Sequence, residues 1–66
     1  MVVKIVELVG VSPKNFEDAV GQAVKRASKT VKNISGVDLI GQSARVEGGK
    51  VVEYRANVKI AFVVED

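Results

Sequence analysis

The fold is decided by residues 51–64, which read VVEYRANVKIAFVV. Apolar and polar residues alternate over most of this stretch, and a period of two is typical of a β-strand with one buried face. The apolar set consists of Val52, Tyr54, Ala56, Val58, Ile60, Phe62 and Val64. Ala61 and Val63 make the far end apolar on both faces. The strand is longer than one small core needs, and its far end is apolar on both faces. We therefore predict that this end contacts another subunit.

A helix precedes this strand. Ser12 and Pro13 predict its start, as N-cap and first helical residue. The apolar residues that follow recur at steps of three and four, which indicates one amphipathic stripe. They are Phe16, Ala19, Val20, Ala23, Val24, Ala27, Val31 and Ile34. The predicted helix covers residues 13–33, with Asn33 and Gly36 as stop residues, and its stripe should pack on the apolar face of 51–64.

Two further strands complete the pattern. Residues 2–9 are rich in β-branched side chains and stop at Gly10, and residues 37–46 form a second strand. Gly41 inside it predicts a bulge or a close backbone approach, and residues 47–50, EGGK, predict a hairpin turn because glycine accepts positive φ. The helix carries the chain back past the sheet, so strand 51–64 should lie in the middle. The predicted fold is α+β, of β-α-β-β order, with a three-stranded antiparallel twisted sheet wrapped around one helix, as a single domain over residues 1–66.

Composition narrows the function. The 66 residues include no cysteine and no histidine, which excludes disulfides, Cys/His zinc sites, thiol nucleophiles and imidazole bases. We therefore expect a non-catalytic protein. A chain this short is marginally stable alone, and homo-oligomerisation is the remaining way to stabilise it. Ten basic and eight acidic residues give an ordinary surface of charge +2. With no membrane-length apolar run and no signal-peptide pattern, the expected location is the cytoplasm.

Three side-chain groups leave alternatives open. The basic cluster of the helix is either a phosphate-binding surface or a solvated face favoured by the helix dipole, and the second interpretation is preferred. It consists of Lys25, Arg26, Lys29 and Lys32. The acids Glu47, Glu65 and Asp66 could hold a hard cation around a symmetry axis, although plain surface acids explain them better. The aromatics Phe16, Tyr54 and Phe62 all fall on predicted core faces, so core packing is the expected role.

Three blocks of sequence resemble the dodecins, and together they cover the chain. They are residues 4–13 (KIVELVGVSP), residues 23–34 (AVKRASKTVKNI) and residues 53–62 (EYRANVKIAF). The resemblance implies the β-α-β-β fold, a hollow homododecamer of cubic symmetry, and binding or storage of flavin (FMN or riboflavin) or a related small metabolite. The alternative is a structural or ion-binding dodecamer without flavin. Nucleic-acid binding through the helix is a distant third interpretation.

The resemblance also implies positions for the flavin site. Flavin-binding dodecins stack isoalloxazine rings between tryptophans and hold the ring edge with a glutamine of the third strand. Carried over by position, the site falls on Gly36, Asp38 and Arg55, and Gly36 and Arg55 are expected to be neighbours on the sheet face away from the helix. Gly36 replaces the tryptophan and Arg55 the glutamine. The stacking platform and the neutral hydrogen-bonding group are therefore missing. Arg55 is expected to form a structural ion pair or, second, to bind a phosphate or carboxylate.

Overall fold

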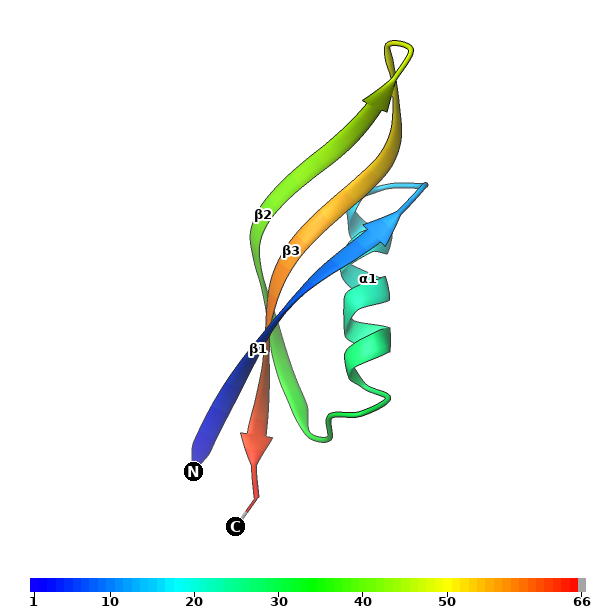
Figure 1. Ribbon diagram of the computed structural model, residues 1–66. Helices are drawn as coiled ribbons and strands as arrows, with labels where there is room; N and C mark the ends of the chain where they lie inside the picture. Colours follow the sequence, from blue (N-terminus) through cyan, green and yellow to red (C-terminus); the bar gives the residue numbers. More distant parts are fainter. Residues whose placement is uncertain (66) are drawn as a thin grey trace.

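The computed structural model describes residues 1–65 and has the expected order of elements. Strand β1 (Val2–Ser12) leads to helix α1 (Phe16–Ala27), and β2 (Ile34–Glu47) and β3 (Lys50–Val64) form a long hairpin. The sheet order is β1-β3-β2, and β3 is antiparallel to both neighbours (Figure 1). The predicted α+β class, the sheet topology and the central position of the last strand are confirmed.

The alternation along β3 sorts its residues as predicted. Ala56, Val58 and Ile60 are fully buried, while Arg55 and Asn57 between them are exposed. The helix meets this ribbon with small residues spaced by four, Ala19, Ala23 and Ala27, all of which are buried. These six residues form the core, and Val6, Leu8, Val20, Val24 and Ile34 pack around it. Because alanine side chains are short, α1 lies close to the sheet.

The helix starts later than predicted. Its N-cap is Asn15, whose side chain accepts a hydrogen bond from the Asp18 amide at 2.7 Å. Ser12 instead ends β1 opposite Tyr54 and is fully buried. Its hydroxyl donates to the Asp18 carboxylate at 2.6 Å and accepts from the Lys14 amide at 2.9 Å. Ser12 pairs in the sheet, and Asn15, an equally good capping residue, caps the helix. The prediction that Ser12 is the N-cap was therefore wrong.

The helix also ends earlier than residue 33. Ser28 is the C-cap, and the amides of Lys29 and Thr30 bond to carbonyls three residues back, a tighter turn than the α-helix. Asn33 then takes a left-handed conformation with φ of 64°, and Ile34 begins β2 opposite Phe62. The apolar spacing of Val31 and Ile34 fits a helix by chance, because these residues belong to the connection and to the sheet.

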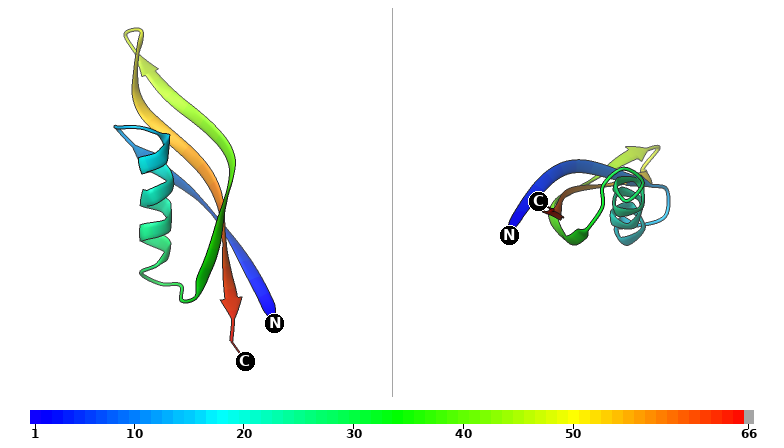
Figure 2. Two further views of the ribbon diagram at one scale, coloured as in Figure 1. Left: turned by 180° about the vertical axis from the view of Figure 1, so that it is seen from behind. Right: turned by 90° about the horizontal axis from the view of Figure 1, so that it is seen from below.

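Glycines shape both outer strands. Gly10 does not end β1 but lies within it, where an added Cβ would stand 1.8 Å from the Ala19 carbonyl oxygen. In β2 the register shifts between Leu39 and Gly41, which confirms the predicted bulge. Gly48 and Gly49 adopt φ of 56° and 77°, which confirms the predicted turn. Bulges increase the local twist of a strand, and Figure 2 shows the sheet curling with α1 on one side only.

The open face of the sheet as a candidate functional site

One face of the sheet is left uncovered by α1, and we call it the outer face. It is built from the β3 residues that alternate with the buried ribbon, together with their partners on either side. Their register defines rows across the sheet: Ile5–Ala61–Gly36, Glu7–Lys59–Asp38, Val9–Asn57–Gly41 and Val11–Arg55–Ser43. Glu53 and Arg45 form the next row toward the hairpin turn. Partners in a row point to the same side of the sheet, so all three positions carried over from the dodecins lie on this face.

The β1 margin of the outer face is apolar. Val3, Ile5, Val9 and Val11 keep 48%, 52%, 56% and 44% of their surface exposed. They alternate along one strand with the residues that face the helix, so they form an apolar stripe that only Glu7 interrupts, between Ile5 and Val9. An exposed apolar stripe of this kind marks an interaction surface. The predicted subunit contact at Ala61 and Val63 adjoins this stripe, because these residues pair with Ile5 and Val3.

Gly36 and Arg55 are not neighbours within one protomer, contrary to expectation. Gly36 pairs with Ala61 and Arg55 pairs with Ser43. Ala61 and Arg55 lie six positions apart on β3, which at about 3.3 Å per residue is about 20 Å. In an antiparallel hairpin that turns at Gly48 and Gly49, a residue far before the turn pairs with one far after it, so Gly36 lies opposite Ala61 and Arg55 lies opposite Ser43. One protomer therefore does not bring Gly36 and Arg55 into the same pocket.

Gly36 and Asp38 occupy the other end of the outer face. No atom lies within 4 Å of the position that a Cβ of Gly36 would take, so the space above it is open. Asp38 pairs across the strands with Lys59, whose ammonium lies 3.9 Å from the Glu7 carboxylate. Glu7, Lys59 and Asp38 thus form a mixed-charge row directly beside Gly36.

Arg55 forms an ion pair, as the preferred sequence interpretation stated, but within its own strand. Its Nε donates to the Glu53 carboxylate at 2.7 Å. The Nε of Arg45 lies 3.7 Å from the same carboxylate oxygen, and Arg45 also pairs with Glu47. Both arginine side chains are half exposed, whereas Glu53 keeps only 21% of its side chain exposed. One carboxylate therefore holds two guanidinium groups close together.

Two hollows follow one another along the outer face. The first has a volume of ≈ 240 Å³ and lies over Asn57, between Val9 and the bulge residue Ile40. The second, of ≈ 210 Å³, is lined by Ser43, Ala44, Arg45 and Arg55. Sequence reasoning missed Ser43, Arg45 and Ile40. The sequence did carry a signal for Ser43 and Arg45, because residues two positions apart in a strand lie on the same face.

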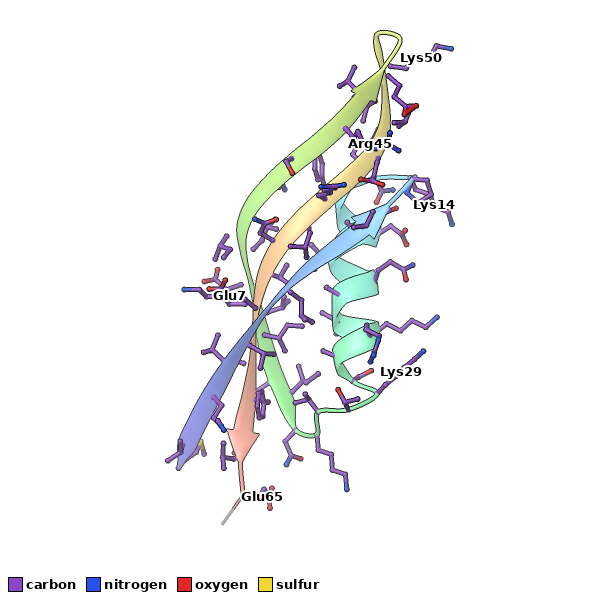
Figure 3. The ribbon with its side chains drawn as sticks, viewed as in Figure 1. Glu7, Lys14, Lys29, Arg45, Lys50 and Glu65 are labelled. Carbon is purple, nitrogen blue, oxygen red and sulfur yellow. The ribbon has the colours of Figure 1, made fainter. Side chains whose placement is uncertain are left out.

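The other predicted groups do not converge. Glu47 lies beside the hairpin turn and Glu65 at the opposite end of the molecule, as the labels of Arg45, Lys50 and Glu65 in Figure 3 indicate. Asp66 lies outside the described residues, and residues 1–65 contain no group of three acidic side chains suited to a metal ion. Phe16 and Tyr54 pack edge to face with ring centroids 5.0 Å apart, and both are half-buried beside the core rather than within it. Phe62 is half-buried opposite Ile34.

The basic cluster predicted on the helix is exposed to solvent. Lys25, Arg26 and Lys29 are exposed, and within residues 1–65 none of them forms a salt bridge. They surround a small hollow together with Gln22. Within the same part of the chain, no helix has the length and hydropathy needed to cross a membrane.

Comparisons with known proteins agree with this architecture. The family model for dodecins matches residues 2–65. The calcium dodecin of Mycobacterium tuberculosis is 31% identical over 61 residues, covering 92% of this chain and 86% of the relative. The dodecin of Streptomyces coelicolor superposes with a TM-score of 0.95 at 29% identity, over 98% of this chain and 93% of that one. The crystal structure of the M. tuberculosis calcium dodecin matches with a TM-score of 0.84 at 32% identity, over 98% and 93% of the two chains. The chain therefore belongs to the dodecin family.

Proposed function

We propose that this chain forms a homododecameric cage that binds and stores flavin or a related small metabolite, without catalysing a reaction. The observation that carries the proposal is the outer face, where the carried-over site positions and the apolar β1 stripe lie together. Four of the six core residues are alanines, whereas eleven large hydrophobic residues among residues 1–65 stay exposed. A protomer of this composition gains more stability from burying that surface against its copies than from its own core.

Light scattering tests the assembly. We expect a mass near twelve protomers, and a folded monomer at micromolar concentration would refute the assembly. Ile5→Asp places a carboxylate in the apolar stripe beside Ala61 and is expected to lower the mass, because an interface buries that charge without a partner. Gln22→Asp adds the same charge to the exposed side of α1 and is the matched control. Equal masses for both variants would show that the stripe is not an interface.

If flavin binds at the positions carried over from the dodecins, its pocket is formed by more than one subunit. Gly36 and Arg55 lie about 20 Å apart in one protomer, so a flavin contacting both would lie between subunits. Gly36 offers no ring to stack on, and Arg55 has donors but no acceptor for the ring edge. We therefore expect weak binding of bare flavins. The test is the absorbance spectrum of the protein as purified, with mass spectrometry of whatever ligand is released. A purified dodecamer that releases no small molecule, and that binds none of the flavins or nucleotides tested, would contradict a storage role.

The calcium dodecin relative favours a second candidate, a structural dodecamer that binds a cation. Among the described residues no three acids gather in one protomer, so such a site would combine carboxylates of several subunits. Glu7 and Asp38 flank Lys59 on the outer face and are the acids that we propose for it. Calcium titration by calorimetry distinguishes the candidates. Stoichiometric calcium binding that Asp38→Asn abolishes, in a protein without flavin affinity, would replace the first proposal with the second.

A further inference from the structure

The two hollows of the outer face lie in consecutive rows, and their linings differ in character. The first, over Asn57, is mainly apolar and is flanked by Val9 and Ile40, with Glu7 on the side away from the hairpin. The second, one row nearer the hairpin, is lined by two guanidinium groups and the Ser43 hydroxyl. Consecutive rows on one face are two residues apart, or about 7 Å. A mainly apolar hollow followed at this distance by a cationic one suits a molecule with a flat apolar body and an anionic end.

The arginines keep hydrogen-bond donors available. Arg55 uses its Nε for Glu53, and within residues 1–65 its two terminal nitrogens form no hydrogen bond or ion pair. Arg45 uses one terminal nitrogen for Glu47 and has its Nε near Glu53. Glu53 therefore fixes the direction of both side chains without occupying all their donors. A planar guanidinium with free terminal N–H groups is suited to binding phosphate oxygens in bidentate fashion.

We propose that the Arg45–Arg55 hollow is a phosphate subsite, and that the ligand class of this protein is phosphate-terminated aromatic metabolites. The inference rests on the proposed small-molecule function and specifies its ligand. The aromatic body lies over Asn57 between Val9 and Ile40, and the phosphate is held by Arg55, Arg45 and the Ser43 hydroxyl. Arg55 stands where flavin-binding dodecins have a glutamine, and this replacement moves recognition from the ring to the phosphate.

Glu53 sets the strength of this subsite. Two arginines balanced by Glu47 and Glu53 give the cluster no net charge, and a phosphate monoester carries nearly two negative charges at pH 7. Glu53→Gln keeps a side-chain oxygen that accepts the Arg55 hydrogen bond but removes one competing negative charge. This variant should therefore bind phosphate esters more tightly than the parent, whereas a purely structural role of the ion pair predicts no gain.

The test compares ligands that differ only by the phosphate. FMN and riboflavin share one ring system, and binding of each is followed by fluorescence quenching. We expect FMN to bind at least about tenfold more tightly than riboflavin, the magnitude of one charge-assisted bidentate contact. Arg55→Gln should reduce the FMN/riboflavin ratio to near one and leave riboflavin affinity at or above its parental value. Glu53→Gln should raise FMN affinity alone. Arg26→Gln, which removes an exposed arginine from α1, is the control and should change neither.

Adenosine monophosphate and adenosine repeat the comparison with another ring, by calorimetry. If the assembled protein binds neither flavin, the flavin form of the proposed function fails, while a phosphate-dependent difference between the adenine ligands still supports this subsite. Equal affinity within both ligand pairs, or an equal loss in Arg55→Gln and Arg26→Gln, would overturn the inference even if flavins bind. Tighter adenosine monophosphate binding in Glu53→Gln would support it.

Discussion

The contact between β1 and α1 at Gly10 gives the sharpest test of the fold. A Cβ added there would stand 1.8 Å from the Ala19 carbonyl oxygen and 3.1 Å from the Ala23 Cβ. Ordinary nonbonded separations are about 3.5 Å, so the helix must move away by more than about 1.5 Å. That movement loosens the alanine stripe that seals the core. Overpacking usually costs about 1–3 kcal/mol, and because the clash is with backbone we expect Gly10→Ala to reach the upper end.

The matched control is Gly21→Ala, the same chemical change on the exposed side of α1. No atom lies within 4 Å of the added Cβ, and alanine is favoured over glycine inside a helix by about 1 kcal/mol. The two variants should therefore change stability in opposite directions, by about 4 kcal/mol in total. For a domain of this size that is at least about 15 °C in melting temperature.

Thermal unfolding followed by circular dichroism at one fixed protomer concentration measures both variants, because assembly makes the midpoint depend on concentration. Equal midpoints for Gly10→Ala and Gly21→Ala would refute the close approach of helix and strand. A stabilised Gly10→Ala protein would show that the space beside Gly10 is filled differently in solution.

Three further predictions concern the core, the helix cap and the flavin position. Ile60→Asp should abolish folding, because the side chain is fully buried and an unpaired carboxylate there costs several kcal/mol, whereas Val51→Asp at the exposed hairpin end should still fold by circular dichroism. Asn15→Ala should destabilise by about 1 kcal/mol in urea unfolding through the lost cap, and an unchanged midpoint would contradict a helix that begins after Asn15. The parent should bind riboflavin with a dissociation constant above about 10 μM, and the Gly36→Trp, Arg55→Gln double variant should bind it more tightly by fluorescence quenching; submicromolar binding by the parent would show that neither replacement weakens flavin binding.

Alternation and turn chemistry made the sheet predictable. The period of two along β3 separates buried Val58 from exposed Asn57, and two glycines set the hairpin turn. The helix ends were less predictable, because Ser12 and Asn15 are both good caps and only tertiary pairing with Tyr54 assigns Ser12 to the strand. Gly10 was predicted to end the strand because glycine often ends strands. The close contact with α1 that requires glycine there is not visible in the sequence.

The candidate site was predictable as a face but not as a constellation. Positional carry-over put Gly36, Asp38 and Arg55 on the outer face. Their separation depends on the strand register, which the three irregularities of β2 shift along the hairpin. The association of Arg55 with Arg45 through Glu53 depends on the same register, and residue spacing within either strand alone does not reveal it.

The pairing of β1 with β3 stops at Ser12 and Tyr54, whereas β2 and β3 continue to the turn. The hairpin therefore projects as a two-stranded arm beyond the rest of the sheet (Figure 1). Two strands alone are marginally stable in water, so the arm's amide protons should exchange within seconds to minutes in a free protomer and slowly where a neighbour covers them. The rate of deuterium uptake at residues 45–53 thus reports whether subunits have associated, and the measurement needs no label on the protein.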